Sequence, residues 1–301
     1  MSPFVALVIA NIIWGGASPI FKYALQNIPP FTLAFIRFFF AGLIFLPLAI
    51  LNWQKLTKEE WFRVMLIGFF GVGINVSFYF LGLRMTESIN VPIIASSGPV
   101  LVYLFSIYFL KEKPKSGVFF GMMMSLLGVL VIILSPIFLE GKGLILGAIE
   151  GNIFILIATL GKVFQTIVSR EIMKKINPFQ VTAITFLVFS FMFLPFIPNE
   201  LSNWDISFLN NQGLLGIVYG IFLSSGVAYY LFYYGLSKMN AHEAGLFDYL
   251  DPIVAVIIAM PLLGEYPSIF HFIGSVLVFA GIYKSEGKQF IKSLLAKRRG
   301  K

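Results

Sequence analysis

Ten long apolar stretches, separated by short loops, make up nearly all of the sequence. They cover approximately residues 3–24, 31–51, 63–83, 90–110, 117–136, 144–168, 179–198, 213–236, 244–263 and 268–284. A bilayer core about 30 Å thick is crossed by about 20 helical residues. In lipid, only helices or closed barrels satisfy their own backbone hydrogen bonds, and these stretches are too long and continuous for barrel strands. The sequence therefore predicts an all-α integral membrane protein with ten transmembrane helices.

The composition agrees with this class and argues against several others. The chain is 58% hydrophobic and 12% charged, against about 25% charged residues in globular proteins. The absence of cysteine excludes disulfides, thiolate metal sites and cysteine nucleophiles. No zinc-binding H-E-x-x-H helix, G-x-S-x-G elbow or phosphate-binding P-loop occurs in the sequence. We therefore expect neither an enzyme nor a bound cofactor or metal.

The distribution of basic residues predicts the topology. If the N-terminus is cytoplasmic, 17 of the 22 Lys and Arg residues fall in inner loops and the C-terminal tail, and only Lys22, Arg84 and Lys142 fall in outer loops. Such an excess marks the cytoplasmic side, so both termini are expected there, in a cytoplasmic membrane. The net charge of +8 then needs no nucleic acid as partner. The basic tail, residues 286–301, anchors the topology or lies on anionic lipid headgroups.

The chain contains an internal repeat. A shift of 148 residues lays Pro178-Phe179 on Pro30-Phe31 and Phe193 on Phe45. A shift of 153 residues superposes a second series, in which Pro252, Glu265, Pro267, Gly274 and Gly281 fall on Pro99, Glu112, Pro114, Gly121 and Gly128. We expect one five-helix repeat over 1–140 and another over 141–285. Because five is odd, the second repeat enters the membrane from the opposite side, as in the inverted repeats of secondary transporters.

These features resemble the EamA type of the drug/metabolite transporter superfamily over essentially the whole chain. The likeness rests on Trp14-Gly15, on Arg37 after Pro30, on Pro99 followed by Glu112, and on Leu250-Asp251-Pro252 with Leu263-Gly264-Glu265. The resemblance implies secondary transport, commonly export, of small metabolites or amphipathic compounds. The two copies have diverged where charge matters, since Arg37 aligns with Thr185 and Trp14 aligns with Lys162.

Ionisable residues inside a membrane usually face a cavity or a partner, and four of those in the predicted helices stand out. Arg37 and Glu150 both lie about 9 Å below the outer boundary, so we expect them either to pair or to extend to the headgroups. Lys162, Asp248 and Asp251 lie at similar depth in the inner leaflet, and the two acids, three residues apart, share one helix face. We expect Lys162 and Asp251 to form a charged pair. A proton on Asp251 could then couple to substrate movement; a purely structural salt bridge is the alternative.

Polar stripes on several helices suggest the wall of a substrate path. The candidates are Asn11 and Trp14 in the first stretch, Asn75 and Tyr79 in the third, Lys162 and Gln165 in the sixth, Tyr229 in the eighth and Asp251 in the ninth. Aromatic rings with polar tips suit an amphipathic organic substrate. Tyr233 and Tyr234, near a helix end, instead fit the aromatic belt of the membrane interface.

Two matched pairs are expected to have structural or gating roles. Pro99 and Pro252 interrupt their helices, because proline removes a backbone donor, and they serve as hinges or as packing kinks. Glu112 and Glu265 follow at the membrane boundary, where a carboxylate can cap the N-terminus of a neighbouring helix.

The sequence thus predicts a secondary transporter that exports an amino acid or another amphipathic metabolite by alternating access. Import or exchange of a sugar- or nucleotide-like solute, a passive helical channel and an intramembrane enzyme are the alternatives. The substrate, the coupling ion and the oligomeric state are left open by the sequence.

Overall fold

A computed structural model describes residues 1–98, 100, 101, 105, 116–139, 146–173, 175–238 and 246–284. All the regular structure in these residues is helical. Pro99, Glu112 and the tail 286–301 lie outside the described residues, so the expectations for them stay predictions.

The first half of the chain forms long helices joined by short loops. They are α1 (Pro3–Ala24), α2 (Pro30–Leu51), α3 (Lys58–Gly68) continued by the π-helix η1 (Phe69–Ile74) and α4 (Asn75–Met85), then α5 (Asn90–Ala95) and α7 (Ser116–Leu139). Pro3 and Pro30 stand in the first turn of their helices, where a missing N–H costs nothing. Thr57 and Glu60 form a capping box at the start of α3.

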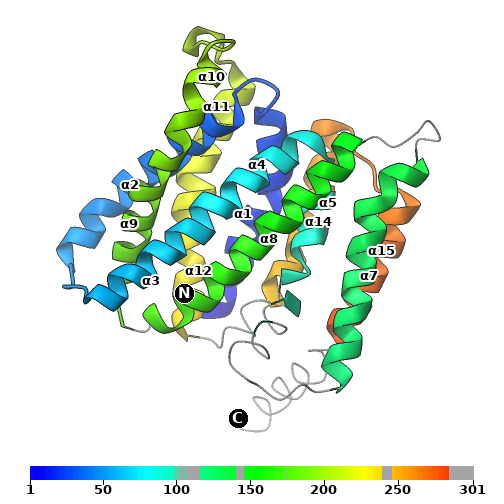
Figure 1. The fold of residues 1–301 in the computed structure, drawn as a ribbon, viewed down its shortest axis with the longest axis horizontal. Coiled ribbons are helices and arrows are strands. Elements are labelled where there is room, and N and C mark those ends of the chain that lie inside the picture. Colours follow the sequence, from blue (N-terminus) through cyan, green and yellow to red (C-terminus); the bar gives the residue numbers. More distant parts are fainter. Residues whose placement is uncertain are drawn as a thin grey trace.

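The second half repeats this order. It contains α8 (Leu146–Ile172), α9 (Pro178–Ser190) continued by η2 (Phe191–Phe196) and α10 (Ile197–Leu201), the short turn η3 (Ile206–Phe208), then α11 (Asn211–Val218) continued by the π-helix η4 (Tyr219–Val227) and α12 (Ala228–Lys238). The last described elements are η5 (Leu246–Leu250), α14 (Asp251–Leu263) and α15 (Ile269–Ile282). In Figure 1, α7 and α15 lie together at one edge of the bundle, and α2 and α9 lie together at the other.

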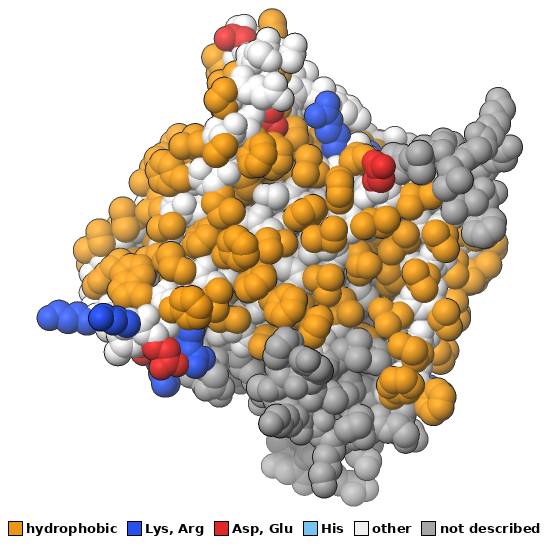
Figure 2. All heavy atoms as spheres, viewed as in Figure 1, with side chains coloured by type: hydrophobic (Ala, Val, Ile, Leu, Met, Phe, Trp, Pro, Cys, Tyr) orange, Lys and Arg blue, Asp and Glu red, His pale blue; other side chains and the backbone are white. Residues whose placement is uncertain are grey.

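Many of these helices suit a bilayer. Within the described residues, six helical stretches are long and apolar enough to span a membrane: Pro3–Ala24, Pro30–Leu51, Lys58–Met85, Ala148–Ser169, Pro178–Leu201 and Asn211–Gly235. Figure 2 shows hydrophobic side chains across the middle of one face, with charged side chains at its upper and lower margins. This arrangement matches a hydrocarbon layer bounded by polar surfaces on both sides.

The contact between α2 and α9 is reciprocal. Phe31 and Phe45 of α2 are equivalent to Phe179 and Phe193 under the 148-residue shift. The ring of Phe31 lies 6.2 Å from that of Phe193, and the ring of Phe45 lies 6.0 Å from that of Phe179. Each half therefore presents the same surface to the other, as across a two-fold axis.

The contact between α7 and α15 is also reciprocal, and glycines form it. Gly121 and Gly128 are equivalent to Gly274 and Gly281 under the 153-residue shift. A Cβ atom on Gly128 would lie 2.5 Å from the carbonyl oxygen of Gly274, and one on Gly281 would overlap the carbonyl oxygen of Gly121. The two helices approach this closely because their contact surface carries no side chains there.

Irregular backbone also recurs at matched positions. Shifted by 153 residues, η1 falls on residues 222–227, inside η4. The turn at Ser96–Ser97, which ends α5, falls on the last two residues of η5, immediately before α14. Pro252 accordingly stands in the first turn of α14, where the 3₁₀ turn η5 gives way to the α-helix. The helix is already interrupted before the proline, so the ring fits without breaking an established hydrogen bond.

Candidate functional site

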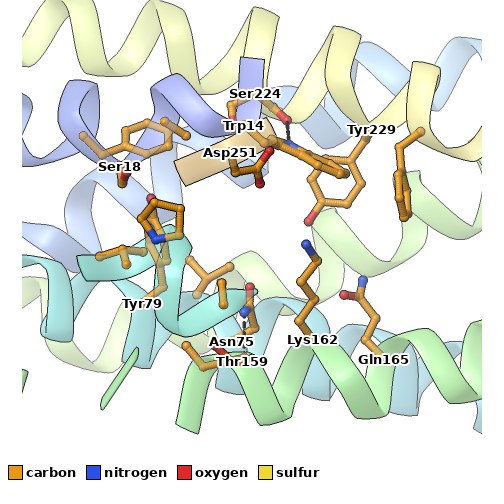
Figure 3. A pocket seen from close by; sticks show the side chains of 18 of the residues that line it. Trp14, Ser18, Asn75, Tyr79, Thr159, Lys162, Gln165, Ser224, Tyr229 and Asp251 are labelled. Atoms are coloured by element: carbon orange, nitrogen blue, oxygen red, sulfur yellow. Dashed lines mark hydrogen bonds between the residues drawn. The ribbon is translucent and has the colours of Figure 1, made fainter. Parts of the chain in front are cut away.

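A cavity of about 150 Å³ lies between the two halves. Its wall is formed by α1, α2, α4 and α5 from the first half and by α8, η4, α12 and α14 from the second. A cavity of this size holds one small organic group, since about 150 Å³ accommodates a benzene ring. Figure 3 shows Lys162 and Gln165 extending from α8 toward Trp14, Tyr229 and Asp251.

Seven of the eight path candidates are found on this wall. They are Trp14, Asn75, Tyr79, Lys162, Gln165, Tyr229 and Asp251. Asn11 is not among the lining residues; it is fully buried, and its Nδ2 donates to the carbonyl of Leu7 in the same helix at 2.9 Å. The polar stripe of α1 thus continues past the cavity, and at Asn11 it is covered by packed helices.

Trp14 joins the aromatic part of the wall to the π-helix η4. Its Nε1 donates to the carbonyl of Ser224 at 3.1 Å. Its ring lies 5.2 Å from that of Tyr229 and 4.9 Å from that of Phe232. The Nζ of Lys162 lies 5.3 Å from the centre of the Trp14 ring, within cation–π range.

The ion pair of Lys162 differs from the one expected. Its Nζ lies 3.4 Å from Oδ2 of Asp248, whereas Asp251 Oδ1 is buried and has no hydrogen-bond partner within the described residues. Asp248 lies in the 3₁₀ turn η5, which leads directly into α14 at Asp251, so the two acids stand three residues apart in adjoining helical segments. The sequence identified this cluster, but the prediction that Asp251 is the partner of Lys162 was wrong.

Gly15 allows the start of α14, and with it Asp251, to lie at the cavity. A Cβ atom on Gly15 would lie 2.9 Å from both Cα and the carbonyl oxygen of Asp251. The start of α14 can therefore contact α1 only because Gly15 has no side chain. On the opposite wall, Gly71 of η1 leaves the space that the Gln165 side chain occupies.

Arg37 also lines the cavity, and the expected pair with Glu150 does not form. The Nε of Arg37 donates to the Ser225 hydroxyl at 2.7 Å, and its Nη2 donates to the Ser224 hydroxyl at 2.9 Å. Glu150 is exposed on α8. Equal depth along two helices did not predict a contact, because the guanidinium points inward toward η4.

Glu265 lies apart from the cavity and binds the start of α5. It accepts hydrogen bonds from the backbone N–H and hydroxyl of Ser88, at 2.7 and 2.6 Å, and from the backbone N–H of Ile89 at 3.3 Å. Its Oε1 is 3.7 Å from the Nζ of Lys22. The carboxylate thus satisfies free amides at a helix N-terminus and joins α1, α5 and the loop before α15.

Several wall residues were not predicted from the sequence. Ser224 and the α5 residues Val91, Pro92 and Ala95 line the cavity, and the apolar ones carry no signal that separates them from lipid-facing positions. Tyr233, which the sequence assigned to the interfacial belt, is buried on the wall instead. Tyr230, its neighbour three residues earlier, is exposed and stacks on Phe179.

The model of the EamA-like transporter family matches the chain twice, over residues 1–134 and 149–285. The chain belongs to the EamA-like transporter family. It is therefore a transporter and a multi-pass membrane protein, with two EamA domains. This match confirms the family resemblance found in the sequence.

Relatives cover nearly the whole chain. The uncharacterized transporter YetK of Bacillus subtilis is 28% identical over 289 residues, which are 94% of this chain and 86% of the relative. An uncharacterized transporter of Archaeoglobus fulgidus is 26% identical over 290 residues, 94% of this chain and 96% of the relative. One crystal structure superposes with a TM-score of 0.67 at 19% identity, covering 95% of this chain and 97% of the other. At that identity it supports the fold alone.

Proposed function

We propose that this chain is a secondary active transporter that moves a small amphipathic metabolite, such as an amino acid, outward across the cytoplasmic membrane by alternating access. The observation that carries the proposal is the cavity between the two halves. Its wall combines aromatic rings, amides and charged groups from both halves. Ligand pockets have this mixture of apolar surface and a few convergent polar groups, and repeat interfaces hold the substrate sites of secondary carriers.

The two halves, residues 1–140 and 141–285, are inverted repeats in this proposal. The reciprocal contacts of α2 with α9 and of α7 with α15 support it, as does the odd number of helices expected in each half. The excess of basic residues in one set of loops supports cytoplasmic termini, with the tail 286–301 on the lipid surface. Two halves built alike can exchange conformations, which gives two mirrored states of similar energy.

Asp251 is the residue we propose for proton coupling. It lines the cavity, and its Oδ1 has no hydrogen-bond partner within the described residues. Asp248 already neutralises Lys162, so a proton taken up by Asp251 changes the net charge of the wall. The carrier can then bind substrate in one protonation state and release it in the other.

Counterflow into liposomes tests the proposal. The purified chain is reconstituted, the vesicles are loaded with an unlabelled amino acid, and entry of the labelled compound is followed over a panel that also includes nucleosides, sugars and amphipathic cations. A carrier gives saturable uptake that the internal solute stimulates; a channel gives neither. Inward accumulation driven by a proton gradient would favour import over export. Asp251→Asn is expected to abolish the pH dependence, and an unchanged profile would remove the coupling role.

A further inference from the structure

Arg37 is a buried cation without an acidic partner. Its side chain belongs to a residue that is 6% exposed, and no carboxylate within the described residues lies within ion-pair distance of it. Lys22 and Lys162, two other cations on the described helices, each have such a partner, Glu265 and Asp248 respectively. Burying an uncompensated charge is costly, so natural proteins normally pair it.

The surroundings of Arg37 hold it without neutralising it. The centre of the guanidinium lies 4.7 Å from the ring centre of Phe21 and 4.6 Å from that of Phe38. Gly220 of η4 leaves room for the methylene stem, since a Cβ atom there would lie 3.2 Å from Cγ and Cδ of Arg37. The guanidinium is therefore fixed by hydroxyls, ring faces and a glycine, none of which carries a negative charge.

The hydrogen-bonding capacity of Arg37 is only partly used. Nε and one N–H of Nη2 donate to Ser225 and Ser224, while Nη1 and the second N–H of Nη2 have no partner within the described residues. These two nitrogens form the end-on fork of the guanidinium, which matches the two oxygens of a carboxylate. Because Arg37 lines the cavity, a bound solute can reach this fork.

We propose that Arg37 is the anion-binding subsite of the cavity and that it takes the carboxylate of the transported solute. The solute supplies the counter-ion that the protein lacks, and its apolar part lies against the aromatic wall. The inference rests on the proposed function, because it assumes that this cavity holds the solute. It narrows the substrate class to organic carboxylates, zwitterions included, and disfavours purely cationic or neutral solutes.

Matched carboxylate and amide ligands test the inference. The full-length purified chain is heated in detergent with phenylacetate, phenylalanine, leucine or benzoate, and with the amide of each. A ligand that binds only the folded protein raises the melting temperature by mass action. We expect at least one carboxylate to bind about tenfold or more tightly than its amide, as a charge-assisted hydrogen bond requires. If no carboxylate exceeds its amide, the inference is overturned.

Variants then assign the effect to Arg37. Arg37→Gln is expected to reduce carboxylate binding to the level of the amide, while Arg37→Lys, which keeps the charge but not the fork, retains part of the preference. Arg63→Gln is the matched control, because Arg63 is exposed and pairs with Glu59 on the surface. If Arg37→Gln does not fold, Arg37→Lys decides the question. An undiminished preference of Arg37→Lys for the carboxylate over its amide would show that the guanidinium fork does not bind the carboxylate.

Two further experiments distinguish a carboxylate subsite from a chloride site and from the transport activity itself. Adding sodium chloride to a buffer that holds neither chloride nor a carboxylate tests whether a small inorganic anion fills the site; an Arg37-dependent shift with chloride and none with any carboxylate would overturn the proposal. Counterflow with the same compounds separates this inference from the proposed function. If carboxylate binding depends on Arg37 but no counterflow occurs, the subsite stands and the proposed carrier function is wrong. If counterflow occurs and is unaffected by Arg37→Lys, the carrier function stands and the proposed subsite is wrong.

Discussion

Trp14 and Lys162 meet across the cavity, with Nζ of Lys162 5.3 Å from the centre of the Trp14 ring. The 148-residue shift that aligns the two halves lays Trp14 on Lys162, so the contact joins equivalent positions. Phe38 and Phe186 are related by the same shift, and their rings lie 4.8 Å apart. Contacts between equivalent residues occur next to a two-fold axis. The Trp14–Lys162 contact is one of these, and both residues line the cavity.

Trp14 is expected to contribute to solute binding through its ring. Trp14→Ala should weaken binding of the ligand that gives the largest thermal shift by roughly tenfold, because a large aromatic contact is lost. Trp14→Phe keeps a ring but loses the hydrogen bond to Ser224, so its affinity for the ligand should lie between those of the wild type and Trp14→Ala. Trp61→Ala, on the exposed side of α3, is the control. Equal effects of Trp14→Ala and Trp61→Ala would argue against a binding role.

Asp248, rather than Asp251, should be the residue on which Lys162 depends for stability. Asp248→Asn leaves a partly buried cation unpaired, and we expect a loss of about 1–3 kcal/mol, below the range for a fully buried pair, because solvent reaches Lys162. Adding Lys162→Met should restore most of that loss. Melting temperatures of the single and double variants measure this coupling. Purely additive losses would contradict the ion pair.

Glu265 should stabilise the fold as a helix cap. Glu265→Ala removes the acceptor of three hydrogen bonds from Ser88 and Ile89 and the partner of Lys22. We expect a loss of about 1–3 kcal/mol, the range for a lost cap and unsatisfied buried groups. Glu59→Ala removes an exposed acid whose partner is four residues away and should change the melting temperature little. A similar small effect for both variants would show that the cap is dispensable.

The glycines between α7 and α15 should not tolerate a methyl group. Gly128→Ala would place a Cβ atom 2.5 Å from the carbonyl oxygen of Gly274, and overpacking of this kind costs about 1–3 kcal/mol. Gly98→Ala is the control, since its Cβ atom would meet nothing closer than 3.8 Å. Thermal unfolding in detergent compares the two. If Gly128→Ala melts with the wild type, the close approach of the two helices is not needed for stability.

Local sequence signals were enough to find the polar positions of the cavity. Asn75, Lys162 and Gln165 recur at helical spacing in otherwise apolar segments, and such positions avoid lipid. The same signal failed at Asn11, because periodicity identifies the inward side of a helix but not where along it a cavity opens. It also failed for Tyr233, since an aromatic residue near a helix end looks the same whether it contacts headgroups or a cavity.

The partners of the charged residues could not be predicted from the sequence. Depth in the membrane placed Arg37 beside Glu150 and Lys162 beside Asp251, yet the structure joins Arg37 to Ser224 and Ser225, and Lys162 to Asp248. A depth is a coordinate along one axis, whereas a contact also requires the rotation and neighbours of each helix. The π-helix η4 presents two consecutive serines to one guanidinium, and no local sequence pattern predicts that segment to be a π-helix.

The sequence by itself determined that this protein is a bundle of apolar helices in two related halves, because the hydrocarbon core dictates helix length and composition, and because duplication leaves matched residues at a constant spacing. Only the tertiary structure decided that the halves meet through reciprocal contacts, that a cavity opens beside Trp14 and Lys162, and that Arg37 faces it without an acidic partner. These features depend on how closely the helices pack, which local sequence does not give: the missing side chain of Gly15 admits the backbone of Asp251, and that of Gly220 admits the side chain of Arg37.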